Sequence, residues 1–463
     1  MKATFIKQTG RAICVATVLL LGNSLSTFAQ TVSDADAHEI VTKLGDRLVD
    51  VYPFPEISEK YKADLLKNEA AGHYHSLTET ELAAKLTADM RATHKDVHLR
   101  VSRNEESYKN MTEPRGNRRG GARTSEDNSN ERANYGFKRV EIDGTTSTAY
   151  VEIPGPFLAS EEALDIAAAS MNMCAFSKYV ILDVRHNPGG TGQMGRFLAS
   201  YFYPTGREQF YLNGFYKDRT RDEQEWTYTY VPGRHMPDAK VYILTSRGTG
   251  SASEGFAYAM QQLKRATIVG DTSAGAGIAG GNVALKNNLV AFVPVKMVVG
   301  PHDNHGWEGT GVIPDVETGK DDALAATHKL ILQDILANSV DTLQKAAAQW
   351  VLDDSGIASN AATNMKAKYG DLVGKYSSNI TITYIKGDLL WNRVEPGKPT
   401  ESYPLKEVKP DVLVAVGLNA NIGPNVSRIY INRDAKGKVE SLTRKTLGGN
   451  GRISTTGMPI KKV

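Results

Sequence analysis

The segment Val241–Leu263 constrains the fold of this chain more than any other stretch of its sequence. It begins with an apolar run, Val241 to Leu244, which is typical of a buried strand, and a turn of small residues follows. A helical pattern then starts near Ser253. Ser251 is therefore predicted at a strand-to-helix junction, where backbone N–H groups and the positive end of the helix dipole converge. A serine there either caps the helix or exposes its hydroxyl beside a place that can stabilise an oxyanion.

The first thirty residues have the layout of a secretory signal peptide. Lys2, Lys7 and Arg11 precede an apolar run from Ala12 to Leu21, and a small-residue region ends at Ala29–Gln30. The apolar run is too short to span a bilayer. We therefore expect cleavage near the end of this segment and a secreted or periplasmic protein without a stable membrane anchor.

Charge and cysteine content narrow the possible partners of the mature chain. Removing residues 1–30 takes away three positive charges and no acids, which brings the formal net charge from +3 to zero. The charge therefore gives no reason to expect a nucleic-acid partner. Cys174 is the one cysteine left, so the mature chain cannot form an internal disulfide and must be stabilised by core packing.

Changes of pattern along the chain predict five segments after the signal peptide. Residues 31–103 read as a helical N-terminal domain, with Asp34 as the first helix cap and a strand from Asp96 to Val101 that carries His98. Residues 104–134 offer almost nothing to bury, which predicts a flexible polar insertion. The remainder divides into a core at 135–320, a helical connector at 321–360, and a C-terminal domain at 361–463.

The core and the C-terminal domain differ in the order of their predicted elements. In the core, strands alternate with helices, which predicts an α/β fold with a mostly parallel, twisted sheet and helices on both faces. A strand is expected at Thr227–Val231, and a long helical stretch from Asp322 to Trp350. The last hundred or so residues read as short strands separated by turns, which favours a small antiparallel β-barrel.

Three motifs in the core carry a resemblance to a known family. They are Asp183-x-Arg185-x-Asn187-x-Gly189-Gly190, then Ser251-Ala252-Ser253-Glu254, then Glu308-Gly309-x-Gly311-Val312-x-Pro314-Asp315. In this order and spacing they resemble the core of the C-terminal processing (tail-specific) serine peptidases, which include the tricorn core peptidases and the retinoid-binding repeats. The likeness covers about Tyr135 to Val316 and the strand of His98. It implies a crotonase-like peptidase core with an N-terminal helical cap.

The resemblance also implies roles for individual residues. Ser251 matches the nucleophile. Ala276 occupies the place of the lysine in the members that use a Ser–Lys dyad, so that dyad is not expected here. His98 and Glu308 match the base and the acid of the tricorn-like branch, although that branch has a serine directly before the histidine and this chain has Val97.

Elementary chemistry is consistent with those roles. A serine hydroxyl needs a base to take its proton, and a histidine suits that task near neutral pH. A carboxylate behind the histidine fixes its tautomer and stabilises the imidazolium. The oxyanion needs N–H donors, for which Ala252 and either Gly189 or Gly190 are the candidates.

The prediction is a serine endopeptidase that acts on peptides or unfolded proteins without a metal or organic cofactor. The main alternative is a non-catalytic protein of the same fold that binds peptides or an apolar ligand. A metal site at His302, His305 and Glu308 is a lesser alternative. The sequence does not predict an oligomeric state, and it contains no phosphate-binding loop motif of the Walker type.

Overall fold

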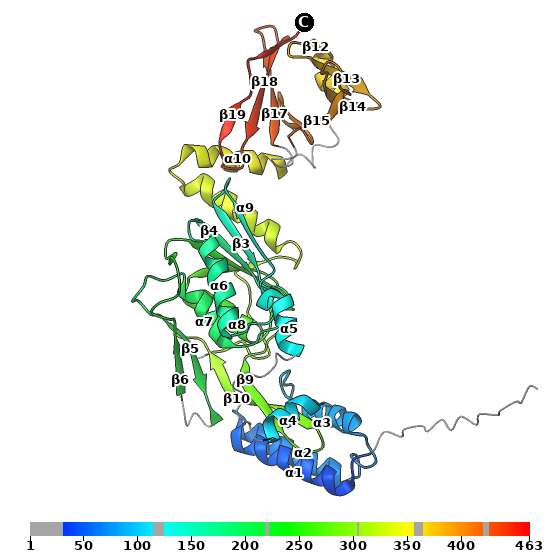
Figure 1. The fold of residues 1–463 in the computed structure, drawn as a ribbon, viewed down its shortest axis with the longest axis vertical. Helices are drawn as coiled ribbons and strands as arrows, with labels where there is room; N and C mark the ends of the chain where they lie inside the picture. The colour runs from blue at the N-terminus through cyan, green and yellow to red at the C-terminus, as the bar shows by residue number, and fades with distance from the viewer. Residues whose placement is uncertain (1–30, 114–124, 218–221, 303–304, 356–363, 420–425) are drawn as a thin grey trace, which may run out of the picture.

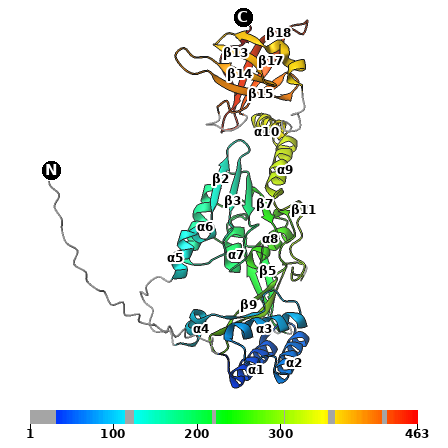
Figure 2. The ribbon, with the colours of Figure 1, turned by 90° about the vertical axis from the view of Figure 1, so that its right-hand side faces the viewer.

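The computed structural model describes residues 31–113, 125–217, 222–302, 305–355, 364–419 and 426–463. The molecule is elongated, with the N-terminal helices at one end, an α/β core in the middle and a β-sheet domain at the other end (Figures 1 and 2). The predicted signal peptide, residues 1–30, lies outside the described residues.

Three helices and a short strand form the N-terminal domain. They are α1 (Asp34–Val51), α2 (Pro55–Ala70), α3 (Glu79–Thr93) and β1 (Arg100–Arg103). The side chain of Ser33, one residue before the predicted cap Asp34, accepts the hydrogen bond that starts α1. The strand also begins later than predicted, so His98 lies in the turn that precedes β1.

The polar insertion contains helices in its described parts, which differs from the flexible segment that its composition predicts. These are α4 (Glu105–Thr112), α5 (Ser125–Arg132) and the 3₁₀ turn η1 (Asn134–Gly136). Asn104 caps α4 through a hydrogen bond from the Ser107 N–H, yet no residue of α4 is buried. Local capping, and not burial, therefore explains why this polar stretch is helical.

The core is built on a six-stranded sheet in the order β11-β8-β7-β4-β3-β2, and all neighbours are parallel except β2 and β3. Its strands are β2 (Arg139–Asp143), β3 (Thr148–Glu152), β4 (Tyr179–Asp183), β7 (Lys240–Thr245), β8 (Ala266–Gly270) and β11 (Val316–Glu317). The prediction of a mostly parallel sheet is confirmed.

Helices cover both faces of this sheet, as the alternation of elements predicts. One face packs against α6 (Glu161–Met173), α7 (Gly192–Ser200) and α8 (Ala252–Gln262). The other face packs against α9 (Ala323–Asn338) and α10 (Thr342–Ser355). The expected single long helix is thus two helices, separated at residues 339–341.

A second sheet connects the core to the N-terminal domain. It contains β5 (Phe210–Phe215), β6 (Asp222–Trp226), β9 (Ile278–Ala284) and β10 (Leu289–Val299), together with β1. β10 is the central strand, and its first half packs into the hydrophobic cluster of the N-terminal helices. The expected strand at Thr227–Val231 is not formed, because the partner of β5 is the preceding stretch, β6.

The C-terminal domain is a nearly closed antiparallel sheet, as predicted. It begins with α11 (Met365–Tyr369) and the turn η4 (Gly370–Leu372). Its strands are β12 (Gly374–Tyr376), β13 (Ile380–Ile385), β14 (Asp388–Arg393), β15 (Glu401–Lys409), β16 (Val412–Ala415), β17 (Ser427–Arg433), β18 (Val439–Leu447), β19 (Ile453–Thr455) and β20 (Ile460–Lys461). A bridge between Tyr376 and Lys462 joins the first strand to the end of the chain, and a separate hydrophobic core fills the interior.

Candidate active site

Ser251 lies at the junction between β7 and α8, as predicted, and its backbone is unusual. Its φ of 49° and ψ of −118° place a non-glycine residue in a region of the Ramachandran plot with positive φ. Such conformations are costly and cluster at functional sites, where the surrounding structure holds them in place. The strain at Ser251 is an observation that helix capping alone does not explain.

Glu254 holds this junction in place. Its buried carboxylate accepts hydrogen bonds from the N–H of Ser251 (2.7 Å), the hydroxyl of Ser273 (2.6 Å), and the N–H groups of Gly275 (2.6 Å) and Ala276 (2.8 Å). Burial raises the pKa of the Glu254 carboxyl, and the four donors oppose that shift. The carboxylate therefore ties the nucleophile turn to the loop 273–276. The sequence analysis gave Glu254 no role, although its position three residues after Ser251 is a capping-box pattern.

Of the two predicted glycines, Gly189 lies directly beside Ser251, and Gly190 packs against the backbone of Phe157 and lines the same cavity as Ser251. A Cβ atom on Gly189 would be 2.6 Å from the Cβ of Ser251, and both Gly189 and Gly190 have positive φ, 108° and 128°. The side chain of Asn187 fixes this loop, since its amide group donates to the carbonyl of Gly155 (2.6 Å) and its oxygen accepts from the N–H of Gly189 (2.9 Å). Glycine is required here because backbone and Ser251 approach so closely.

Two backbone N–H groups remain available next to Ser251. Within the described ranges, no hydrogen-bond acceptor is found for the N–H of Gly190 or of Ala252, whereas the N–H of Gly189 is occupied by Asn187. Ala252 is the first residue of α8, so its N–H also lies at the positive end of the helix dipole. Paired N–H donors of this kind are what an oxyanion requires.

A cavity of about 140 Å³ opens beside Ser251. Apolar side chains contribute much of its lining, among them Leu212, Ile278, Val298 and Trp307. A cavity of about 150 Å³ with such a lining accommodates a benzene ring. The space beside Ser251 is therefore suited to one medium-sized apolar side chain.

A lysine that the sequence analysis missed lines the same cavity. Lys296 is 13% exposed, and its ammonium lies 3.3 Å from a carboxylate oxygen of Glu223 and 3.4 Å from one of Glu225. It comes from β10 and not from the loop where the Ser–Lys members of the family carry theirs. Its ammonium is thus engaged by two carboxylates, and within the described ranges no hydrogen bond joins it to Ser251.

The contacts of His98 are made with its own turn and with β10. Its backbone N–H donates to Asp96 (2.8 Å), and its ring stacks on Phe292 with the ring centres 5.9 Å apart. Nδ1 is buried without a hydrogen-bond partner, and burial lowers the pKa of the imidazole. Across the described part of the chain, no hydrogen bond or ion pair joins His98 to Ser251 or Glu308.

Glu308 lies in the turn at residues 308–310, after β10, and its carboxylate reaches the residue that precedes β9. Its carboxylate accepts a hydrogen bond from the N–H of Gly277 (2.5 Å), and burial raises its pKa to about 7. The charges of Asp96 and Glu254 act in the same direction. The structure thus assembles Ser251, Ala252, Gly189 and Gly190 into one site, while His98 and Glu308 stand on neighbouring segments and are not bonded to that site or to each other.

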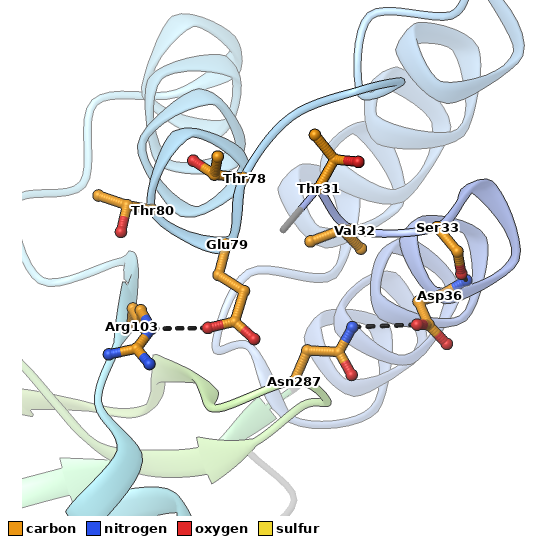
Figure 3. Close-up of a pocket in the computed structure, with 9 residues that line it drawn as sticks. All are labelled: Thr31, Val32, Ser33, Asp36, Thr78, Glu79, Thr80, Arg103 and Asn287. Atoms are coloured by element: carbon orange, nitrogen blue, oxygen red, sulfur yellow. Dashed lines mark hydrogen bonds and ion pairs between the residues drawn. The ribbon is translucent and has the colours of Figure 1, made fainter. Parts of the chain in front are cut away.

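Other features of the described residues do not form a competing site. No group of three or more metal-ligating side chains occurs among them, which leaves the metal alternative without support. In the searched part of the chain, no helix combines the length and apolarity needed to cross a membrane. A larger cavity of about 660 Å³ lies among the N-terminal helices (Figure 3).

The larger cavity contains none of the predicted site residues. Its charged side chains are engaged in contacts of their own, since Glu79 pairs with Arg103 (2.6 Å) and Asp36 accepts from Asn287 (3.1 Å), as the dashed lines of Figure 3 show. We therefore assign the candidate active site to the cavity beside Ser251.

Comparison with known proteins identifies the family to which the described domains are similar. Residues 147–318 match the model described as peptidase family S41, and residues 32–138 match the N-terminal domain of peptidase S41 in eukaryotic IRBP. A carboxyl-terminal-processing protease of Synechocystis is 31% identical over 135 residues, which is 29% of this chain and 30% of that protein. A "Probable CtpA-like serine protease" of Staphylococcus epidermidis is 29% identical over 140 residues, which is 30% of this chain and 27% of that protein. The chain thus spans less than a third of the length of these relatives.

Solved structures give more distant matches. The photosystem II D1 C-terminal processing protease aligns with 62% of this chain and 94% of its own, at 13% identity and a TM-score of 0.42. The tricorn protease aligns with 65% of this chain and 37% of its own, at 13% identity and a TM-score of 0.38. From the two family matches, which together extend over the N-terminal domain and the core, the chain belongs to peptidase family S41, the C-terminal processing peptidases.

Proposed function

We propose that this protein is a secreted or periplasmic serine endopeptidase in which Ser251 forms an acyl-enzyme with the carbonyl carbon of a peptide bond. The observation that carries the proposal is the pair of available N–H groups, on Gly190 and Ala252, beside a strained serine and an apolar cavity. In this arrangement the two N–H groups stabilise the oxyanion, and the cavity takes a side chain of the substrate.

His98 is the general base of this proposal. It takes the proton of Ser251 during attack and gives it to the leaving amine, and water then hydrolyses the acyl-enzyme by the same route. The lowered pKa of His98 keeps the imidazole neutral at pH 7, which is the form that accepts a proton. Glu308 supports the imidazolium.

In this mechanism the proton passes directly between Ser251 and His98, which share no hydrogen bond among the described residues, so the segments that carry them must come together. β10 is the strand that joins them, and β1 pairs with its residues 289–292 while β5 pairs with 297–299, so residues 293–296 have a partner on one side only. The register with β9 also shifts between Pro294 and Lys296. A bend at this bulge is the simplest way to bring His98 to Ser251, and catalytic contacts are often loose before substrate binds.

Hydrolysis of fluorescein-labelled casein, an unfolded protein, tests the proposal. We expect the wild type to release labelled peptides, and Ser251→Ala and His98→Ala to lose that activity. His94→Ala is the matched control, because His94 is an exposed histidine only four residues away. Activity that survives Ser251→Ala, or an equal loss in His94→Ala and His98→Ala, would contradict the assigned roles.

Export is tested separately by sequencing the amino terminus of the protein recovered from the periplasm or the culture medium. We expect it to begin at or next to Gln30, after removal of the basic and apolar segment. Recovery of the protein in the cytoplasm with Met1 in place would contradict export.

A non-catalytic binding protein of the same fold is the second candidate. The observation that favours it is the engagement of Lys296 by two carboxylates, together with the lack of a hydrogen bond between His98 and Ser251 in the described part of the chain. A folded wild type that binds unfolded proteins without cleaving them would support this candidate over the peptidase.

A further inference from the structure

The strand β9 leads away from the Ser251 cavity and has one unpaired edge. Ile278 and Ala279, its first two residues, line that cavity. Its register with β10 runs from Ile278 to Ala284, and within the described ranges no strand pairs with its other edge. Gly280, Gly281 and Asn282 are exposed. A row of unpaired N–H and C=O groups thus extends from the cavity into solvent.

The hydrogen bonds around β10 show which residues of β9 present those groups. The carbonyl of Leu289 accepts from Leu285 on the β9 side, whereas the carbonyl of Asn288 accepts from Asn104 on the β1 side. The N–H and C=O groups of successive residues point to opposite sides of a strand. The N–H and C=O groups of even-numbered residues in the first half of β10, such as Phe292, therefore point away from β9. Phe292 is the partner of Asn282 and Pro294 that of Gly280, so these two pairs exchange no hydrogen bonds. Gly280 and Asn282 therefore direct their N–H and C=O groups to the free edge.

A carboxylate already occupies the end of this edge nearest the cavity. The N–H of Gly277, the residue just before β9, donates to the carboxylate of Glu308 (2.5 Å). Farther along, β9 carries no proline or lysine and no further strand pairs with it in the described ranges, although the helix α4 lies close to β9. Two adjacent glycines also mark a place where another backbone can approach closely.

We propose that an extended peptide binds by adding as a strand to the free edge of β9, with main-chain hydrogen bonds to Gly280 and Asn282. The peptide then continues past Ile278 into the cavity, where Ser251 meets it. Main-chain bonds supply affinity in such strand addition, whereas pockets for alternate side chains supply selectivity. The inference rests on the proposed function for its choice of a peptide as the ligand, and it adds where and in which conformation the peptide lies.

Two substitutions at one position test the strand addition. Asn282→Pro removes the outward N–H and places a ring at the edge, yet it leaves the ladder to β10 intact, a situation in which strands tolerate proline. Asn282→Ala keeps the N–H and is the matched control. The probe is the tightest-binding member of a fluorescein-labelled octapeptide library selected on Ser251→Ala, and binding is measured by fluorescence anisotropy in that same background.

We expect Asn282→Pro to weaken binding by at least about five-fold, which corresponds to one main-chain hydrogen bond, while Asn282→Ala stays within two-fold of the parent. Equal binding by both variants would overturn the proposal. Thermal unfolding of both variants establishes whether the proline variant retains its fold.

A second measurement modifies the peptide, so it does not depend on the stability of any β9 variant. Each amide of the selected octapeptide is N-methylated in turn and its binding to Ser251→Ala is measured. Strand addition predicts losses at every second position, because only alternate N–H groups face β9. Uniform losses, or none, would overturn it. Both measurements read binding and not cleavage, so they can succeed where the casein assay fails, and the two proposals are judged independently.

Discussion

Replacement of Glu254 by glutamine tests whether this carboxylate holds the active-site junction together. Its two oxygens each accept two hydrogen bonds, one from Ser273 and Gly275 and the other from Ala276 and Ser251. A glutamine has one acceptor oxygen, and its NH₂ group must face at least one of the backbone N–H donors whichever way it is turned.

The expected cost follows from those contacts. One orientation leaves the N–H groups of Ala276 and Ser251 without an acceptor, and the other leaves that of Gly275. An unsatisfied buried donor costs about 1–3 kcal/mol, so Glu254→Gln in its less costly orientation should lower the free energy of unfolding of the core by about 1–3 kcal/mol. Release of the Ser251 turn should also slow reaction of the serine with a fluorophosphonate by at least about ten-fold.

Urea unfolding and the labelling rate measure these two effects on the same protein. Glu225→Gln serves as the control, because Glu225 also lies at the cavity but, among the described residues, forms no hydrogen bond to the Ser251 turn. A Glu254→Gln protein with the stability and the labelling rate of the wild type would refute the conclusion that this carboxylate fixes the junction.

Three further changes have defined outcomes. The pKa of Glu308 is about 7 in the folded protein and about 4.5 in the unfolded chain, so between these pH values the native state binds a proton that the unfolded state has lost. The free energy of unfolding therefore falls by about 3 kcal/mol as the pH rises from 4.5 to 7. Urea unfolding of Glu308→Gln should not show this fall. The same change of unfolding free energy with pH in the wild type and in Glu308→Gln would contradict this prediction. Gly189→Ala should abolish fluorophosphonate labelling, because the new Cβ meets Ser251 at 2.6 Å, whereas Gly281→Ala, which adds a Cβ in open space, should label normally. Arg428→Met should lower the free energy of unfolding by about 3–5 kcal/mol and make the C-terminal domain more sensitive to limited proteolysis. The reason is that the buried Arg428 pairs with Asp354 (2.5 Å), and its loss leaves that carboxylate unpaired. An unchanged rate of proteolysis would contradict this prediction.

The features that the sequence predicts well are those set by local patterns. The β7 strand, the turn at Ser251 and the helix α8 follow from an apolar run, small residues and a helical repeat within about twenty residues. The alternation of strands and helices gives the parallel core for the same reason. The prediction that Gly189 lies close to Ser251 depended on the resemblance to a family, because no local pattern in the sequence indicates that contact.

The features that the sequence did not predict depend on long-range pairing. Lys296 reaches the Ser251 cavity because β10 pairs with β5 and β9, and neither the register nor the bulge after Pro294 is visible in the residues alone. The place of His98 relative to Ser251 depends likewise on how the N-terminal domain sits on β10. The unpaired edge of β9 is a property of the assembled sheet, so it too had to come from the structure.

The most direct test of the account is to locate the fluorophosphonate adduct by mass spectrometry of the labelled, protease-digested wild type. The account predicts one modified site, Ser251, and a labelling rate that falls in His98→Ala but not in His94→Ala. An adduct on another serine, or a folded and uninhibited protein that takes up no label, would contradict the conclusion that Ser251 is an activated nucleophile.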